Sequence, residues 1–154
     1  MASNIIAVCD YLVDVVEAAW TGITADDSVE RVYVAPIKLH EQAGRHVFIY
    51  PLSYSNQPAT RGHDEWSYQI GVIVIEGYEQ PGEPTIAWMD ERVDFVQDKV
   101  FDPLDFSRSP AAISGGLRML TTESTCDVYN IDQMIQEKQF RSELRFTFTE
   151  IRGA

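Results

Sequence analysis

Residues 66–78, with the sequence WSYQIGVIVIEGY, decide the fold class of this chain. Their apolar side chains alternate with a period of two, which is typical of a β-strand. The apolar face comprises Trp66, Tyr68, Ile70, Val72 and Val74. The other face begins polar at Ser67 and Gln69 and turns apolar at Ile73 and Ile75. Because part of the strand is apolar on both faces, we expect it in the middle of a sheet.

A second long strand is predicted at the C-terminus, over residues 140–151. Its apolar face comprises Phe140, Leu144, Phe146 and Phe148, and its polar face Arg141, Glu143, Arg145, Thr147 and Thr149. We expect the apolar face to be buried and the polar face to meet solvent or a partner. Since Arg141, Glu143 and Arg145 alternate in sign, they are candidate partner-interface residues, and a plain solvated sheet face is an equal alternative.

Shorter patterns complete the predicted sheet. Strands are expected at residues 32–34, 47–52 and 118–129, a polar turn at 25–30, a turn near Gly44, and a turn or short helix at 131–137. The polar segments 53–65 and 103–116 are predicted as long loops. Loops of that length are often functional, so both are candidate contact segments.

Two amphipathic helices are predicted. The first covers residues 4–20, with Ser3 or Asn4 as its N-cap and Gly22 at its C-terminal cap. Its apolar stripe comprises Ile5, Val8, Cys9, Leu12, Val15, Val16 and Ala19. The second begins at Pro84 and ends at Asp102, and its core stripe comprises Ile86, Met89, Val93, Val96 and Val100.

A neighbouring stripe on the second helix combines aromatic and basic side chains. It comprises Trp88, Arg92, Phe95 and Lys99. Aromatic residues and arginine are enriched at the centres of protein interfaces, so these four are candidate partner-interface residues. The alternative is that Trp88 and Phe95 simply widen the core stripe of the helix.

The order of these elements is a helix, three strands, a helix and two strands. We therefore expect a single α+β domain over residues 1–154, with a mixed, mainly antiparallel sheet of about five strands and two helices packed on one face. The length of 154 residues is that of one domain with one core.

Charge and cysteine content narrow the function classes. The chain has 12 basic and 24 acidic residues and a formal net charge of −12, so it lacks the basic footprint that phosphate binding requires. The two cysteines, Cys9 and Cys126, are expected to be reduced thiols, and Cys9 an inert buried one. No signal peptide or membrane-spanning run is predicted.

No motif in the sequence specifies a chemistry. The histidines His40, His46 and His63 lack metal-ligand spacing, and the His63-Asp64-Glu65 run is favoured as a solvated loop. The run Ser114-Gly115-Gly116 is favoured as a turn, and the pair Asp102 and Asp105 as chance neighbours. We therefore expect no catalytic residue, no metal, no cofactor and no enzymatic activity.

The chain as a whole resembles the tail-terminator proteins of long-tailed bacteriophages. The resemblance includes the N-terminal helix, the helix after the Pro81-Gly82 turn, the strand WSYQIGVIV at 66–74 and the closing strand FRSELRFTF at 140–148. It implies a homo-oligomeric ring, usually hexameric, that sits on the tail tube, stops its polymerisation and joins the tail to the head or neck. The implied partners are a second copy of the chain, the tail-tube protein and a neck or head-completion protein.

DNA would pass through the lumen of such a ring without specific binding, and an acidic lumen would repel it. The implied location is the virion, with assembly in the host cytoplasm. Three alternatives stay open: another neck or head-closure component, a small enzyme with a cryptic acidic site, and a generic binding module with a partner on its sheet face.

Overall fold

The computed structural model describes residues 4–34, 43–60, 63–78, 84–113, 116–136 and 138–151, without the side chains of 58–60, 63, 64, 133 and 135. Within them the backbone forms one six-stranded sheet in the order β1-β2-β3-β6-β5-β4. The strands are β1 (Ser28–Arg31), β2 (Arg45–Thr60), β3 (His63–Gly77), β4 (Ala111–Ile113), β5 (Leu117–Asp127) and β6 (Gln139–Ile151). The helices are α1 (Asn4–Ala19), α2 (Ile86–Phe95), η1 (Val96–Phe101) and α3 (Ile131–Gln136).

The sheet is mixed, as predicted. β1 lies parallel to β2, and all other neighbouring strands are antiparallel. The α+β class is therefore confirmed, with six strands in place of about five. β3 lies between β2 and β6, which explains why it is apolar on both faces over Ile73 and Ile75.

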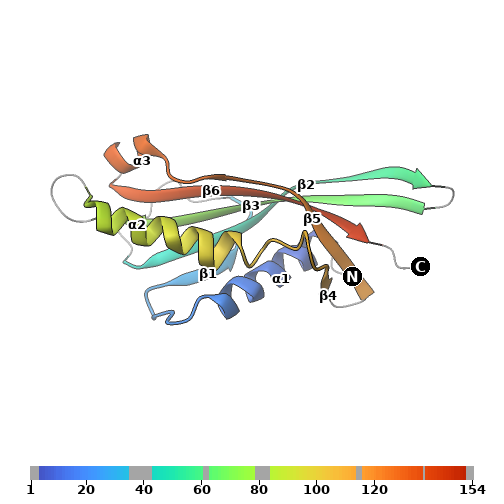
Figure 1. The fold of residues 1–154 in the computed structure, drawn as a ribbon, viewed down its shortest axis with the longest axis horizontal. Coiled ribbons are helices and arrows are strands. Elements are labelled where there is room, and N and C mark those ends of the chain that lie inside the picture. The colour runs from blue at the N-terminus through green and yellow to red at the C-terminus, as the bar shows by residue number, and fades with distance from the viewer. Residues whose placement is uncertain are drawn as a thin grey trace.

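One face of the sheet is covered by α1 and by the continuous rod of α2 and η1 (Figure 1). The main core lies between these helices and the sheet and includes Leu12, Ile70, Val100, Phe146 and Phe148, each at most 1% exposed. We call the opposite side of the sheet the open face. A small second cluster lies there, formed by Phe48, Ile73 and Ile75, with Val32 and Tyr50 packed against it.

The first helix forms as predicted. Its buried residues Val8, Cys9, Leu12 and Val16 recur at spacings of one, three and four. Gly22 has a φ of +85°, the left-handed conformation expected just beyond a helix C-terminus. Asn4 is the first helical residue, and Ser3 lies outside the described residues.

The second helix begins and packs differently from the prediction. Thr85 is its N-cap and accepts a hydrogen bond from the Trp88 N–H at 3.1 Å, so Pro84 precedes the helix. Of the predicted core stripe, Val96 and Val100 are buried and Met89 and Val93 pack against the core, whereas Ile86 is 80% exposed. Phe95 is 7% exposed and Trp88 packs against the core, so both widen the stripe, as the alternative held. The helix widens to a π-helix at η1, and Phe95 and Val100, five residues apart, both face the core.

The first strand lies earlier than predicted. It covers Ser28–Arg31, which overlaps the predicted turn at 25–30, and only Val29 is buried there. Val32 still donates its N–H to the Ile49 carbonyl at 2.9 Å, which extends the pairing by one bond. A single buried residue on an edge strand leaves no alternation in the sequence to detect.

The predicted loop at 53–65 is instead a β-hairpin. β2 and β3 stay paired from Arg45↔Glu76 to Thr60↔His63, whereas β3 pairs with β6 only as far as Ser67↔Thr149. We call residues 56–60 and 63–66, where β2 and β3 pair only with each other, the hairpin arm. It extends past the end of β6 (Figure 1). The described side chains of residues 53–57 are exposed on both faces, so hydrophobic alternation could not reveal the strand.

The remaining segments agree more closely with expectation. The predicted strands at 118–129 and 140–151 correspond to β5 and β6, and α3 occupies the predicted turn or short helix. The predicted loop at 103–116 contains the short edge strand β4. No helix among the described residues is long and apolar enough to cross a membrane.

Candidate interaction surfaces

The aromatic and basic stripe of the second helix lies against its own sheet. Trp88 packs edge-on against Tyr78 with the ring centroids 5.0 Å apart, and Phe95 packs against Trp20 at 4.9 Å. Lys99 lies in η1 and is partly exposed. Trp88, Phe95 and Arg92 therefore already have partners within the chain, and their role in an external interface stays a prediction.

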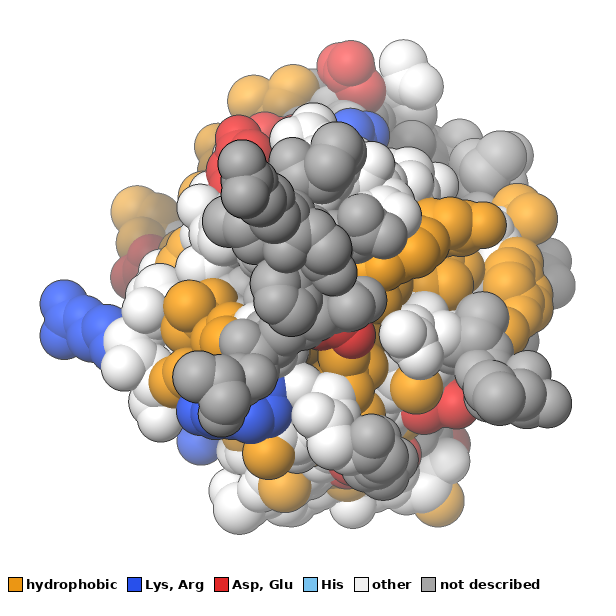
Figure 2. Space-filling model, turned by 90° about the vertical axis from the view of Figure 1, so that its right-hand side faces the viewer, with side chains coloured by type: hydrophobic (Ala, Val, Ile, Leu, Met, Phe, Trp, Pro, Cys, Tyr) orange, Lys and Arg blue, Asp and Glu red, His pale blue; other side chains and the backbone are white. Residues whose placement is uncertain are grey.

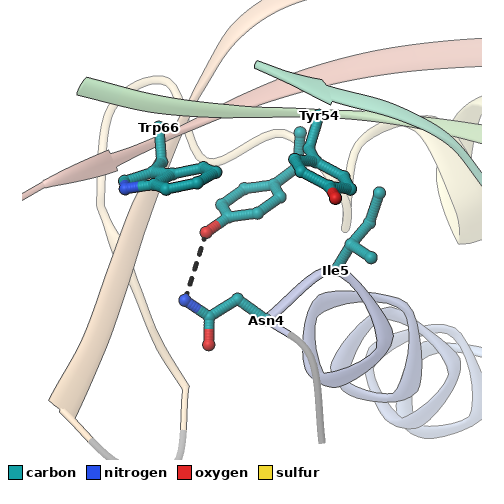
Figure 3. Close-up of a pocket in the computed structure, with 5 residues that line it drawn as sticks. Asn4, Ile5, Tyr54 and Trp66 are labelled. Carbon is teal, nitrogen blue, oxygen red and sulfur yellow. Dashed lines mark hydrogen bonds between the residues drawn. The ribbon is translucent and has the colours of Figure 1, made fainter. Parts of the chain in front are cut away.

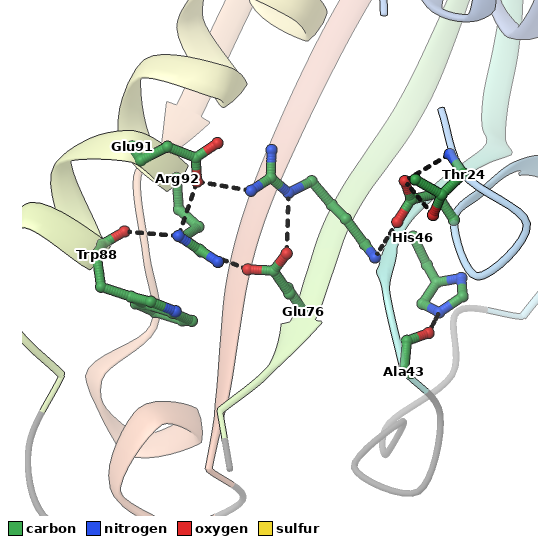
Figure 4. A network of polar contacts seen from close by, with 9 residues as sticks. Thr24, Ala43, His46, Glu76, Trp88, Glu91 and Arg92 are labelled. Carbon is green, nitrogen blue, oxygen red and sulfur yellow. Dashed lines mark hydrogen bonds and ion pairs between the residues drawn. The ribbon is translucent and has the colours of Figure 1, made fainter. Parts of the chain in front are cut away.

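Arg92 belongs to a charge network that joins α2 to the start of β2 and the end of β3 (Figure 4). Glu76 contacts both Arg92 and Arg45, the latter with 3.3 Å between Nε and Oε1. Glu91 contacts the same two guanidinium groups, at 2.7 Å from Arg45 and 2.8 Å from Arg92. Because the side chains of Arg45 and Glu76 are only 10% and 15% exposed, solvent screens their pairing weakly.

Aromatic rings complete this network. The Arg45 guanidinium lies 4.2 Å from the centre of the Phe95 ring, and the Arg92 guanidinium 4.0 Å from that of Trp88. Such stacking is favourable for a partly desolvated cation. Arg45 and Glu76 were missed by sequence reasoning, although they form one rung of the β2–β3 ladder.

Asp27 extends the polar contacts toward the turn before β1. It accepts hydrogen bonds from the Arg45 N–H at 2.8 Å and from the Thr24 N–H at 3.0 Å. Burial alone would raise the pKa of Asp27, but these hydrogen bonds hold the pKa below its ordinary value. Asp27 thus binds the Arg45 backbone on one side of β2, and Glu76 binds the Arg45 side chain on the other. Together these contacts hold the helix on the sheet.

The open face of the sheet carries the other predicted interface residues. Arg141 and Glu143 form an ion pair at 3.0 Å along β6, with their side chains 11% and 41% exposed. Arg145 is exposed and borders a hollow of about 230 Å³. The hollow is lined by residues of β2, β3, β6 and β5, namely Leu52, Gln69, Glu123, Thr125, Arg145, Phe146 and Thr147. The open face therefore carries a hollow and charges of both signs, and its use by a partner stays a prediction.

An apolar pocket lies where the hairpin arm meets the start of α1. Its volume is about 210 Å³, and it is lined by Asn4, Ile5, Tyr54, Trp66 and Tyr68 (Figure 3). The Asn4 side-chain amide donates to the Tyr68 hydroxyl at 3.3 Å, which fixes the floor of the pocket. Tyr54 is 62% exposed, and Figure 2 shows hydrophobic side chains at the surface of this end of the molecule.

A second exposed apolar patch lies at the other end of the molecule, around α3 (Figure 1). Val128, Tyr129 and Ile131 are 43%, 44% and 58% exposed. They border a depression of about 460 Å³ beside Arg141 and Glu143. The long axis of the molecule therefore ends in two different apolar surfaces.

The two aspartates considered as catalytic candidates accept hydrogen bonds from nearby residues, and the two cysteines form no disulfide. Asp102 accepts a hydrogen bond from the Gln97 side chain at 2.6 Å. Asp105 accepts hydrogen bonds from the Ser107 side chain and from the Ser107 N–H, the latter at 3.0 Å, and both lower the pKa of Asp105. Both cysteines are free, and burial raises the pKa of the Cys9 thiol to about 12. Across the described part of the chain no group of three or more metal-ligating side chains occurs. The side chains of His63 and Asp64, and all of Ser114 and Gly115, lie outside the described residues.

A scan of protein-family models and a search of curated proteins found no match to this chain.

Proposed function

We propose that this chain is a virion protein of the tail-terminator kind, which forms a ring on the end of a phage tail tube, stops tube polymerisation and joins the tail to the head or neck. The observation that carries the proposal is the hairpin arm, which projects beyond the rest of the sheet (Figure 1). A protein that acts by shape needs an element that reaches into its partner. The arm is the described element with that form.

The arm is poorly supported by its own chain. A two-stranded ribbon is only marginally stable in water by itself. Gln57 and Glu65 are exposed, although they form one rung of the arm. Such a ribbon gains stability when it lies against another protein, and we assign it to the exposed end of the tail tube.

The opposite end of the molecule suits the second partner. The patch of Val128, Tyr129 and Ile131 is exposed there, and exposed apolar side chains that gather in one place favour protein contacts. We assign this end to the neck or head-completion protein. A ring with different surfaces at its two ends would stop the tube, because the neck end does not repeat the surface that tube subunits recognise.

The charge distribution bears on how DNA would pass. The helix layer carries the acidic side chains Asp10, Asp14, Glu17, Asp90, Glu91, Asp94 and Asp98, whereas the open face carries charges of both signs. The expected acidic lumen would therefore require the helices to face inward. We favour instead a lumen of mixed charge, lined by the open face, where Arg141 is paired with Glu143 and Arg145 is exposed.

The test is a tube-capping assay with the tail-tube protein of the same phage. In the arm-less variant, residues 56–66 are replaced by Asn-Gly, because Ser55 and Ser67 face each other on the ladder and a two-residue turn can join them. Electron microscopy should show tubes capped by the unaltered protein and uncapped, overlong tubes with the arm-less one. Circular dichroism and thermal unfolding of the variant check that the sheet remains.

Two results would count against the proposal. Normal capping by the arm-less variant would remove the arm from the function. Absence of the unaltered protein from tube ends, with binding to the head or neck instead, would favour the alternative of another neck component.

A further inference from the structure

The two edges of the sheet are covered over only part of their length. β1 pairs with β2 at 46–49, and β4 pairs with β5 at 117–119. Beyond these segments, no further strand among the described residues pairs with the outer side of β2 at 50–55 or of β5 at 120–125. Each edge therefore presents free N–H and C=O groups to a further strand.

The open stretches of the two edges lie at the same level of the sheet. At one end, the ladder runs across four strands through Tyr50, Gly71, Arg145 and Thr125; at the other, it runs through Ser55, Ser67, Thr149 and Leu120. Between these two levels, β2 and β5 each contribute six residues, 50–55 and 120–125. We call these stretches the β2 window and the β5 window.

The directions of β2 and β5 also suit a pairing between two copies. β2 and β6 are both antiparallel to β3, and β5 is antiparallel to β6, so β5 runs opposite to β2. If a second copy lies beside the first with its helices on the same side, its β5 meets β2 of the first copy in the antiparallel sense. Antiparallel pairing is slightly more stable per residue than parallel pairing.

The β2 window carries two features that protect edge strands, Pro51 and a bulge between Pro51 and Ser53, but it lacks the third, charged side chains. Its sequence, YPLSYS, holds no charged residue, and it exposes Leu52 and Tyr54 by 39% and 62%. Solvent-facing edge strands usually carry lysine or other charges against unwanted pairing. Pro51 removes one donor and leaves its carbonyl as an acceptor. The β5 window, LTTEST, has one charge at Glu123, so pairing β5 with β5 would bring two carboxylates together, whereas pairing β5 with β2 does not.

We propose that a second copy of this chain adds its β5 window to the β2 window, with Ser53 opposite Thr122 of the added strand. The contact uses different surfaces on the two copies, so it leaves a free window at each end and repeats until a ring closes. That the repeated contact closes into a ring rests on the proposed function. The new element is the contact itself, which joins neighbouring subunits.

The hollow on the open face suits the inner side of a closed ring. It is lined by side chains of β2, β3, β6 and β5. In a ring of sheets joined edge to edge, as in a barrel, we place the open faces inward and the helices outward. The geometry thereby agrees with the lumen lining assigned above.

Single-cysteine variants test this pairing directly. Ser53→Cys and Thr122→Cys are made separately in a Cys126→Ser background, with the buried Cys9 retained. The full-length variants are oxidised mildly, alone and as an equal mixture, and the products are separated under denaturing, non-reducing conditions. We expect a disulfide-linked dimer in the mixture and at least tenfold less of it with either variant alone.

Three results would overturn the pairing. Equal dimer from Ser53→Cys alone indicates β2 against β2, equal dimer from Thr122→Cys alone indicates β5 against β5, and no dimer in the mixture excludes the contact. A charge variant gives a second readout that needs no cysteine. Ser53→Lys should lower the native mass to that of the 17.5 kDa chain, whereas Ser109→Lys, which adds the same charge in an exposed loop, should leave the assembly unchanged.

The same samples separate this inference from the proposed function. Rings that form in the microscope without the cross-link would reject the β2–β5 contact and leave the tube-capping proposal intact. A cross-link in the mixture together with failure to cap tubes would support the contact and reject the tail-terminator function.

Discussion

The network around Glu76 offers the sharpest test of the fold, because Glu76 and Glu91 contact the same two arginines in different surroundings. Their side chains are 15% and 55% exposed, and each reaches both Arg45 and Arg92. The two substitutions Glu76→Gln and Glu91→Gln remove the same charge and keep the same shape. Any difference between them therefore measures the effect of burial.

The expected magnitude follows from that burial. Removing one partner of a buried ion pair costs about 3–5 kcal/mol, because the remaining charge is left uncompensated. Glu91 still contacts both guanidinium groups in the Glu76→Gln variant, so we expect a loss of about 2–3 kcal/mol in the free energy of unfolding. For Glu91→Gln we expect about 0–1 kcal/mol, as for other exposed ion pairs.

Urea-induced unfolding followed by tryptophan fluorescence measures both losses. Thermal unfolding should agree, with a Tm about 5–10 °C lower for Glu76→Gln. Combining Glu76→Gln with Arg92→Met should cost less than the sum of the two single changes, since the second removes a charge that the first left unpaired. Equal losses for the Glu76 and Glu91 variants would refute the assignment of Glu76 as the buried centre of the network.

Three further predictions test other parts of the fold. Phe95→Ala should lower the free energy of unfolding by about 3–4 kcal/mol and Ile86→Ala by less than about 0.5 kcal/mol, because Phe95 is buried against Trp20 and Ile86 is exposed; denaturant unfolding that showed the reverse order would contradict this burial. Gly44→Ala should destabilise the folded protein by about 2 kcal/mol more than Gly22→Ala. Both glycines have positive φ, but only the new Cβ at 44 would lie 2.2 Å from the Asp26 carbonyl oxygen. Equal losses of stability in thermal unfolding would contradict this close approach. Burial raises the pKa of Cys9 from its ordinary 9.0 to about 12. Because the unfolded chain loses this proton first, the stability of the folded protein should fall as pH rises between those values. Cys9→Ala should show a shallower decline of Tm at alkaline pH, and an unchanged decline would remove Cys9 as its cause.

Elements with a regular apolar pattern could be predicted from sequence alone. In α1, Val8, Leu12 and Val16 recur every four residues, and the helix buries all three. In β6, Phe140, Phe146 and Phe148 fall on one face, and each is at most 1% exposed. In both elements a single face is buried, so the local period carries the whole signal.

Elements that are stabilised by backbone pairing gave no such signal. In the hairpin arm, Asn56, Gln57 and Glu65 are polar and exposed, and β1 buries only Val29. Their hydrogen bonds depend on the strand beside them, which sequence periodicity does not report. For the same reason the segment 53–65 was predicted as a loop.

The candidate surfaces divide in the same way. The alternating charges Arg141, Glu143 and Arg145 were visible in the sequence and do lie on the open face of the sheet. The windows at 50–55 and 120–125 were not visible, because they exist only where β1 ends on one edge and β4 ends on the other.

The sequence by itself determined the α+β class, the first helix, the central and closing strands and the acidic charge, since each follows from composition or from a period within one segment. The tertiary structure alone decided that Ile86 is exposed, how Arg45 and Glu76 meet Arg92, and where the sheet stays open. These features depend on contacts between residues far apart in the chain, and such contacts are set by strand register and helix packing rather than by any local pattern.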